Sequence, residues 1–262
     1  MQIRLIRRLI AVAAACLIML QFVSLLATGT LWGQQQAALA IAPGNDAFQR
    51  TWARTDQPVA QGLVDRTWMW APEPFTSVIE EEYADTPGGV RLVQYFDKSR
   101  MEITDPAKDP ADPWYVTNGL LVNELVSGAM QVGHDLFVEG EPAQVNVAGD
   151  SDDPESPTYA TFGPLRTRPP LPDGAVISQR LDRDGAIEND PAMAQHGVTA
   201  AQRVTVPKLD HQVASVFLAF MRSTGAVNVD GQTITERLFE SDFYATGLPI
   251  TEAYWTTVAL KG

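Results

Sequence analysis

The chain has a single cysteine, Cys16, which lies inside an apolar run near the N-terminus. The rest of the sequence therefore forms no disulfide, and thiol chemistry and cysteine–metal sites are excluded from it. Histidine is also scarce, with only His134, His196 and His211 in 262 residues. The sequence has no H-E-x-x-H motif and no G-x-S-x-G nucleophile elbow. We therefore expect all three histidines to be structural or solvent-exposed.

Basic residues are few, with 19 Lys and Arg against 32 Asp and Glu, which gives a net charge of −13. Removing the first 40 residues removes three arginines and no acid, so the remainder carries −16. A surface this acidic repels phosphate backbones, and this predicts no nucleic-acid partner. Hydrophobic residues at 45% and charged residues at 19% are typical of a globular protein rather than a disordered one.

The N-terminus begins with the basic segment "MQIRLIRR", and an apolar run follows from Leu9 to Ala27. That run is just long enough to span a bilayer, and Ala38-Leu39-Ala40 forms an A-x-A cleavage box further on. Residues 1–40 are therefore predicted to be a signal peptide or an N-terminal membrane anchor. In both cases the remainder is extracytoplasmic, secreted or anchored, and meets the membrane only through this segment.

Residues 41–138 are predicted to form a first α+β lobe. Within it, "RLVQYFDKSRMEI" (Arg91–Ile103) has two β-rich runs around Asp97-Lys98-Ser99 and indicates a hairpin. "TNGLLVNELVSG" then has apolar residues at helical spacing. We expect a short helix there, capped by Thr117 or Asn118 and ended by Gly128.

Residues 139–210 are rich in Pro, Gly and Asp and are predicted to be a loop-rich connector with short strands such as "AQVNVAG" and "QRVTVP". "QVASVFLAFMRSTG" (Gln212–Gly225) then predicts an amphipathic helix that opens a second lobe, residues 211–262. Its expected apolar face consists of Val213, Val216, Phe217 and Phe220.

The second lobe is predicted to be an incomplete copy of the first. "PFT" (Pro74–Thr76) is repeated as "PIT" (Pro249–Thr251), and the alignment pairs Pro58-Val59 with Ala226-Val227. The closing "TTVALKG" would be the first strand of an unfinished hairpin. The predicted fold class is therefore α+β, with two related helix-plus-hairpin lobes, the second of which is cut short.

Several segments carry a resemblance to known proteins. "FQRTWARTDQPV", "RTWMW", "GGVRLVQYFDKSRMEI", "VTNGLLVNELVSG" and "FYATGLPITEAYW" resemble an uncharacterised group of exported bacterial proteins with degenerate repeats. More distantly, the order of these motifs is similar to the LGFP-type repeats of secreted cell-envelope proteins. This sequence departs from that pattern with Ala71-Pro72 in place of Leu-Gly and with one and a half units. The resemblance implies association with the cell envelope.

Acidic segments are the remaining places for a metal. Residues 150–157, "DSDDPESP", supply oxygen ligands suited to Ca²⁺, but a soluble turn has the same composition. "LDRDGAIEND" is not an EF-hand, because Arg180 and Pro191 fall where acidic ligands are required. Glu80-Glu81-Glu82 is interpreted as a solvated charge run. We therefore expect no metal and no cofactor.

Aromatic side chains are the candidate ligand platforms, because their flat faces suit sugar rings. In "RTWMW", Trp68 and Trp70 would share one face of a strand with Arg66, and Trp114-Tyr115 forms a second pair. The alternative for these residues is packing in a core that has no disulfides.

The sequence favours a non-catalytic extracytoplasmic module that associates with the cell envelope or its glycans. An exported glycan- or peptidoglycan-directed hydrolase is the first alternative, because the many carboxylates leave room for an acid pair. A structural stalk without a ligand is the second.

Overall fold

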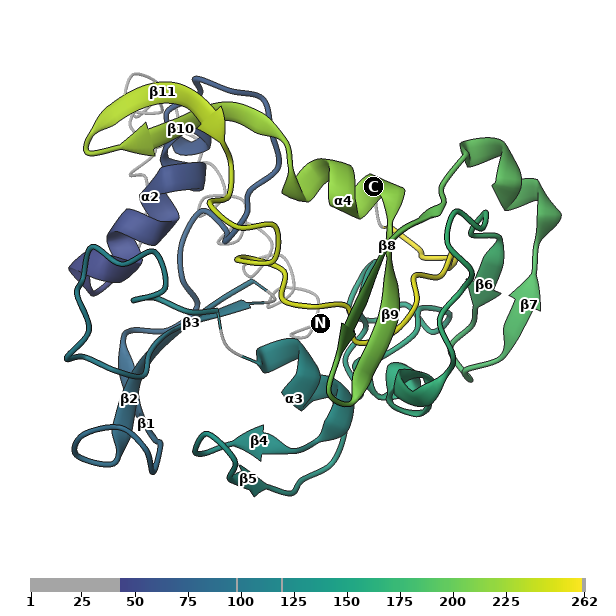
Figure 1. Cartoon of the computed structure of the whole chain (residues 1–262), viewed down its shortest axis with the longest axis horizontal. Coiled ribbons are helices and arrows are strands. Elements are labelled where there is room, and N and C mark those ends of the chain that lie inside the picture. The colour runs from purple at the N-terminus through teal and green to yellow at the C-terminus, as the bar shows by residue number, and fades with distance from the viewer. Residues whose placement is uncertain (1–42, 98, 119, 261–262) are drawn as a thin grey trace, which may run out of the picture. The chain divides into compact units, whose positions relative to one another are not determined.

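The computed structural model describes residues 43–97, 99–118 and 120–260, so the predicted signal or anchor segment, 1–40, lies outside the described residues. Helices and small antiparallel sheets make up the described part (Figure 1), which confirms the α+β class. Every helix within it is too short or too polar to span a bilayer. The elements are α2 (Asp46–Ala60), β1 (Ile79–Glu82), β2 (Val90–Phe96), β3 (Ser99–Ile103), α3 (Leu121–Ser127), β4 (Met130–Gln131), β5 (Phe137–Val138), η1 (Tyr159–Thr167), β6 (Gln179–Leu181), β7 (Ile187–Asn189), η2 (Pro191–His196), β8 (Ala200–Val206), β9 (Leu209–Ala214), α4 (Ser215–Met221), β10 (Thr224–Val229) and β11 (Gln232–Arg237).

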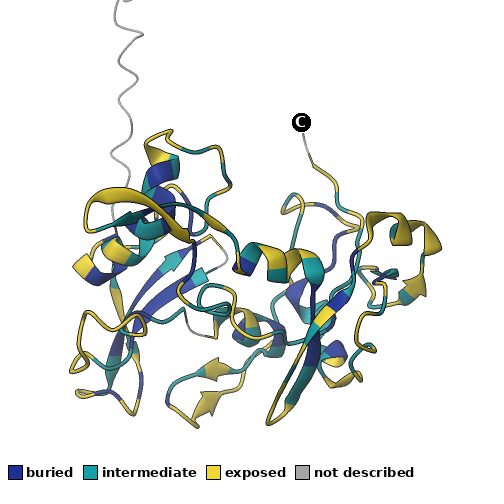
Figure 2. Ribbon diagram, turned by 45° about the horizontal axis from the view of Figure 1, so that its top comes forward, coloured by how far each residue is buried: buried dark blue, intermediate teal, exposed yellow. Residues whose placement is uncertain are grey.

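Helix α2 is the longest regular element among the described residues and presents one side to the core. It begins after Asn45, whose side-chain oxygen accepts a hydrogen bond from the amide of Ala47 at 2.8 Å. Phe48 is fully buried, whereas Arg50 is exposed. Figure 2 shows how buried and exposed residues are distributed over the fold. Pro58 lies in the last turn of α2, which ends at Ala60. Because proline has no N–H to donate to the preceding turn, it weakens the helix at this point.

The predicted hairpin is confirmed as β2 and β3, which pair antiparallel from Leu92–Ile103 to Phe96–Ser99. Strand β1 adds to the other edge of β2 and completes a three-stranded sheet. This sheet and α2 enclose the largest apolar cluster among the described residues. Its buried members are Ala47, Phe48, Trp70, Phe96, Met101, Ile103 and Val116.

Helix α3 confirms the short helix predicted from "TNGLLVNELVSG". It ends at Gly128, whose φ of 77° is left-handed, and a Cβ there would lie 2.5 Å from the carbonyl oxygen of Gly140. The predicted cap at Thr117 or Asn118 is wrong, because Leu120 is the N-cap and makes no side-chain capping bond. The periodic apolar residues locate the helix, but they do not determine where its first turn starts.

Two β-rich runs predicted within the connector have different outcomes. "QRVTVP" is confirmed as a strand except for Pro207, because its other residues belong to β8, which pairs antiparallel with β9. "AQVNVAG" forms no strand and makes only an isolated bridge between Asn146 and Thr158. The predicted lobe boundary at residue 210 falls inside β9, so the connector and the second lobe share this hairpin.

The helix predicted for Gln212–Gly225 is wrong at both ends. Its first residues belong to β9, where Val213 pairs with Gln202, and Gly225 pairs with Glu236 in the β10–β11 hairpin. Only Ser215–Met221 is helical. The expected apolar face also fails, because Val216 and Phe217 are 49% and 56% exposed. Strand pairing on both sides outweighs the helical periodicity of the apolar residues.

The segments that the repeat alignment pairs have different secondary structures. Pro58-Val59 lies in the 15-residue helix α2, whereas Ala226-Val227 lies in strand β10. The final "TTVALKG" forms no strand over residues 256–260. These differences do not support a duplication, and the two-lobe architecture stays a prediction.

The β8–β9 hairpin gives a prediction for acid titration. Arg203 donates to both carboxylate oxygens of Asp210 at 2.7 and 2.6 Å, and this lowers the pKa of Asp210 to about 2. Unfolded aspartate has a pKa of about 3.9. The pair therefore stabilises the fold above that value, and the contribution disappears as the pH falls towards 2. In a carboxyl NMR titration we expect a midpoint of about 2 that moves towards the unfolded value in Arg203→Ala. An unchanged midpoint in the variant would contradict the pairing.

Candidate functional site

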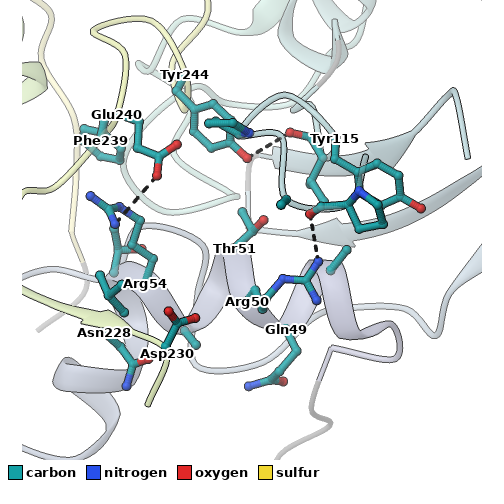
Figure 3. A pocket seen from close by; sticks show the side chains of 18 of the residues that line it. Gln49, Arg50, Thr51, Arg54, Tyr115, Asn228, Asp230, Phe239, Glu240 and Tyr244 are labelled. Atoms are coloured by element: carbon teal, nitrogen blue, oxygen red, sulfur yellow. Dashed lines mark hydrogen bonds and ion pairs between the residues drawn. The ribbon is translucent and has the colours of Figure 1, made fainter. Parts of the chain in front are cut away.

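An open groove lies beside α2 (Figure 3). Its volume is about 830 Å³, within the usual size range of small-ligand sites. Three segments and Trp70 line it, and the segments are one side of α2, the loop 109–116, and the β10–β11 hairpin with the residues that follow. We call this hollow the α2 groove.

The α2 wall carries Arg50, Arg54 and Gln57, which recur at three- and four-residue spacing and so share one side of the helix. Arg50 donates from Nη2 to the carbonyl oxygen of Pro110 at 3.1 Å. Arg54 donates to the carbonyl oxygens of Leu238 at 3.3 Å and of Arg237 at 2.9 Å. The two arginines thus connect the helix to both of the other walls.

The loop wall is built from aspartate turns. Asp109 accepts a hydrogen bond from the amide of Ala111 at 2.9 Å, and Asp112 accepts one from the amide of Trp114 at 2.8 Å. Each aspartate stands before a proline, which fixes the backbone of such a turn. The motif "DPADPW" was the available signal for this loop, and the sequence reasoning did not use it.

The third wall comes from the β10–β11 hairpin, which the sequence reasoning also missed. Val229 pairs with Gln232 across the two-residue turn Asp230-Gly231, whose φ angles are 50° and 82°. Asp-Gly between alternating strand residues is a strong hairpin signal, because both turn positions need a positive φ. The repeat alignment instead pairs Ala226-Val227 of this segment with Pro58-Val59, and it does not use the Asp-Gly turn.

Tyr244, which follows the β10–β11 hairpin in the chain, is hydrogen-bonded to the loop wall of the groove. Its hydroxyl donates to the carbonyl oxygen of Val116 at 2.9 Å, and its own carbonyl accepts a hydrogen bond from Asn118 at 2.8 Å. Burial raises the pKa of the Tyr244 phenol, so it remains a donor at neutral pH. Figure 3 shows Tyr115 and Tyr244 across from Thr51 on α2. The groove therefore has aromatic rings opposite hydrogen-bonding side chains.

Of the five residues predicted from sequence, Tyr115 and Trp70 line the α2 groove. Trp114 is 46% exposed, and its ring centroid lies 5.3 Å from that of Tyr244. Trp70 is only 2% exposed and belongs to the main apolar cluster, as the core alternative predicted. Its indole N–H is buried and has no acceptor within the described part of the chain.

The strand predicted for "RTWMW" does not form. Trp68 stacks on Trp52, with ring centroids 6.5 Å apart. Arg66 donates to the carbonyl oxygens of Ala226, at 3.0 Å, and of Thr55. Burial lowers the pKa of Arg66, and the nearby Asp56 opposes this shift. Arg66 therefore holds β10 against α2.

A second concentration of charged side chains lies at the sheet and is buried except for Glu81, whose side chain is 20% exposed. Arg91 and Arg100 are each 1% exposed, and they form ion pairs with Glu81, Glu102 and Glu124. Burial lowers the pKa of Arg100, but the carboxylates of Glu124 and Glu102 outweigh this and raise it overall. We call these five residues the buried ionic cluster. Because Glu81 belongs to it, the interpretation of residues 80–82 as a solvated run is wrong for Glu81.

The histidines and Trp255 are engaged in structural contacts. His211 is buried, with Nδ1 3.2 Å from Glu252 and Nε2 3.0 Å from the carbonyl oxygen of Arg166. His134 is exposed and lies 3.0 Å from Asp85. The indole of Trp255 donates to the carbonyl oxygen of Ile177 at 2.7 Å and packs near the ring of His196, which fixes the C-terminal segment.

The acidic loop 150–155 also has a structural use. Asp153 accepts hydrogen bonds from the amides of Ala259 at 2.6 Å and Glu155 at 2.9 Å, and these bonds lower its pKa. In the described part of the chain, no group of three or more His, Cys, Asp or Glu side chains is arranged to hold a metal ion.

Comparisons with family models, with curated proteins and with solved structures find no match for this chain.

Proposed function

We propose that the protein is a non-catalytic extracytoplasmic module that binds a cell-envelope glycan in the α2 groove. The observation that carries this proposal is the combination of aromatic and hydrogen-bonding side chains around one open hollow. Tyr115 offers a ring face, and Gln49, Arg50 and Asn228 offer donors and acceptors to sugar hydroxyls. The extracytoplasmic location rests on the predicted N-terminal segment.

The buried indole of Trp70 supports a ligand role for the same groove. Trp N–H groups usually find an acceptor when they are buried. Here Trp70 lines the groove, and its N–H has no acceptor within the described residues. Because the N–H is closed to solvent in this structure, a sugar oxygen would supply that acceptor only if binding opens a path to it.

Binding to soluble N-acetylglucosamine and glucosamine hexamers tests the proposal. The full chain would be purified in a zwitterionic detergent, because sugar-based detergents would compete for the groove. We expect at least one hexamer to bind, and Tyr115→Ala to weaken that binding by about tenfold, the usual loss at an aromatic contact residue. Calorimetric titration measures the effect.

Phe75→Ala is the matched control, because Phe75 is an aromatic residue that is 67% exposed and lies outside the groove. It should bind as the wild type does. If neither hexamer nor purified envelope material binds to the folded wild type, the proposal is wrong, and the structural stalk without a ligand is the better account.

An exported glycan- or peptidoglycan-directed hydrolase is the second candidate, favoured by two acids, Asp230 and Glu240, in the same groove. Release of new reducing ends from the bound glycan, abolished in Asp230→Asn or Glu240→Gln, would establish it. The module account predicts that the glycan is recovered intact.

A further inference from the structure

The charge of the α2 groove restricts the chemistry of its ligand. Four carboxylates line it, against two guanidinium groups, so the groove has an excess of two formal negative charges. The acids are Asp109, Asp112, Asp230 and Glu240, and the cations are Arg50 and Arg54. The strongly acidic chain around the groove adds potential of the same sign. An anionic ligand would therefore be repelled.

The two arginines offset only part of this excess where the aspartates lie. Arg54 is committed to two backbone carbonyls, and the carboxylates of Glu236 and Glu240 lie 3.6 and 3.9 Å from its guanidinium. Arg50 donates to the carbonyl oxygen of Pro110, so its single positive charge lies beside the carboxylates of Asp109 and Asp112 and leaves an excess of one negative charge there. The charge of Arg54 is thus balanced locally, on the side of the groove away from the 109–112 turns.

Asp109 and Asp112 keep part of their hydrogen-bonding capacity for a ligand. Each uses Oδ1 to close its own turn, and Oδ2 makes no hydrogen bond to the described residues. Both residues are exposed. Tyr115, three residues after Asp112, adds an aromatic face, and such faces attract cations. Carboxylate oxygens and an aromatic ring on one loop wall of the groove form a suitable environment for an ammonium group.

We propose that the ligand of the α2 groove is a glycan with free amino groups, that is, one containing unacetylated hexosamine units. This inference rests on the proposed function, since it names the class of glycan that the same groove takes. The ammonium group binds near Asp109 and Asp112, and the sugar ring lies against Tyr115. N-acetylation removes the positive charge and weakens binding.

The test compares a glucosamine hexamer with an N-acetylglucosamine hexamer on the full chain in zwitterionic detergent. We expect the amine-bearing hexamer to bind about tenfold more tightly at low salt. The preference should shrink at about 1 M salt, where the Debye length is only about 3 Å. The double substitution Asp109→Asn with Asp112→Asn should abolish the preference, because an asparagine oxygen can still close each turn while the charge is lost.

Asp105→Asn is the matched control. Asp105 closes the same type of turn, accepting from the amide of Ala107 at 3.0 Å, but it does not line the groove. This variant should keep the full preference. Equal binding of both hexamers to the wild type would overturn the inference and leave the proposed function intact. Binding to an oligolysine peptide but to neither hexamer would overturn both, and would point to a basic protein partner.

Discussion

Replacement of Arg100 by methionine is expected to lower the free energy of unfolding by about 3–5 kcal/mol, the usual cost of breaking a buried ion pair from one side. Arg100 contacts Glu102 at 2.6 Å and both carboxylate oxygens of Glu124, at 2.8 and 2.9 Å. Glu102 is 2% exposed, so without Arg100 its charge stays buried with only Arg91 as a partner. Urea denaturation followed by tryptophan fluorescence measures the loss.

Two variants serve as controls for this prediction. Arg203→Met removes an arginine from an exposed pair, which solvent screens, so it should lower the denaturation midpoint much less than Arg100→Met does. Arg100→Lys keeps the charge but loses the bidentate contact with Glu124. Its loss in free energy of unfolding should therefore lie between those of the other two variants. If Arg100→Met is as stable as the wild type, the buried ionic cluster does not hold α3 to the sheet.

Trp70→Ala is expected to lower the free energy of unfolding by about 3–5 kcal/mol, because it leaves a cavity in the main apolar cluster. Trp70 packs there with Phe48 and Phe96. Trp114→Ala is the control, since Trp114 is 46% exposed, and its truncation should have a much smaller effect. Comparison of the two denaturation midpoints distinguishes a core tryptophan from a surface one. Equal midpoints would contradict the assignment of Trp70 to the core.

Local patterns predict the elements in which neighbours along the chain decide the structure. The β2–β3 hairpin and α3 both follow from periodicity and turn residues within about a dozen positions. The helix predicted for Gln212–Gly225 fails because both of its ends pair with strands elsewhere in the chain. An apolar run of this length fits a strand or a helix, and only the tertiary partners decide.

The buried ionic cluster and the α2 groove could not be predicted, because their residues come from distant segments. Arg100 and Glu124 are 24 positions apart, and the groove combines α2 with residues 109–116 and 228–240. The turns of the groove were predictable individually, from "DPADPW" and from Asp230-Gly231. Their convergence depends on Arg50 and Arg54, whose partners the sequence does not reveal.

Amide hydrogen exchange of the full chain, with and without the hexamer that binds more tightly, tests the groove as a glycan site most directly. We expect protection in residues 49–57, 109–116 and 228–231, because these segments line the groove. Tyr115→Ala should reduce that protection, and Phe75→Ala should not. Protection confined to other segments, with these three unchanged under saturating ligand, would contradict the account.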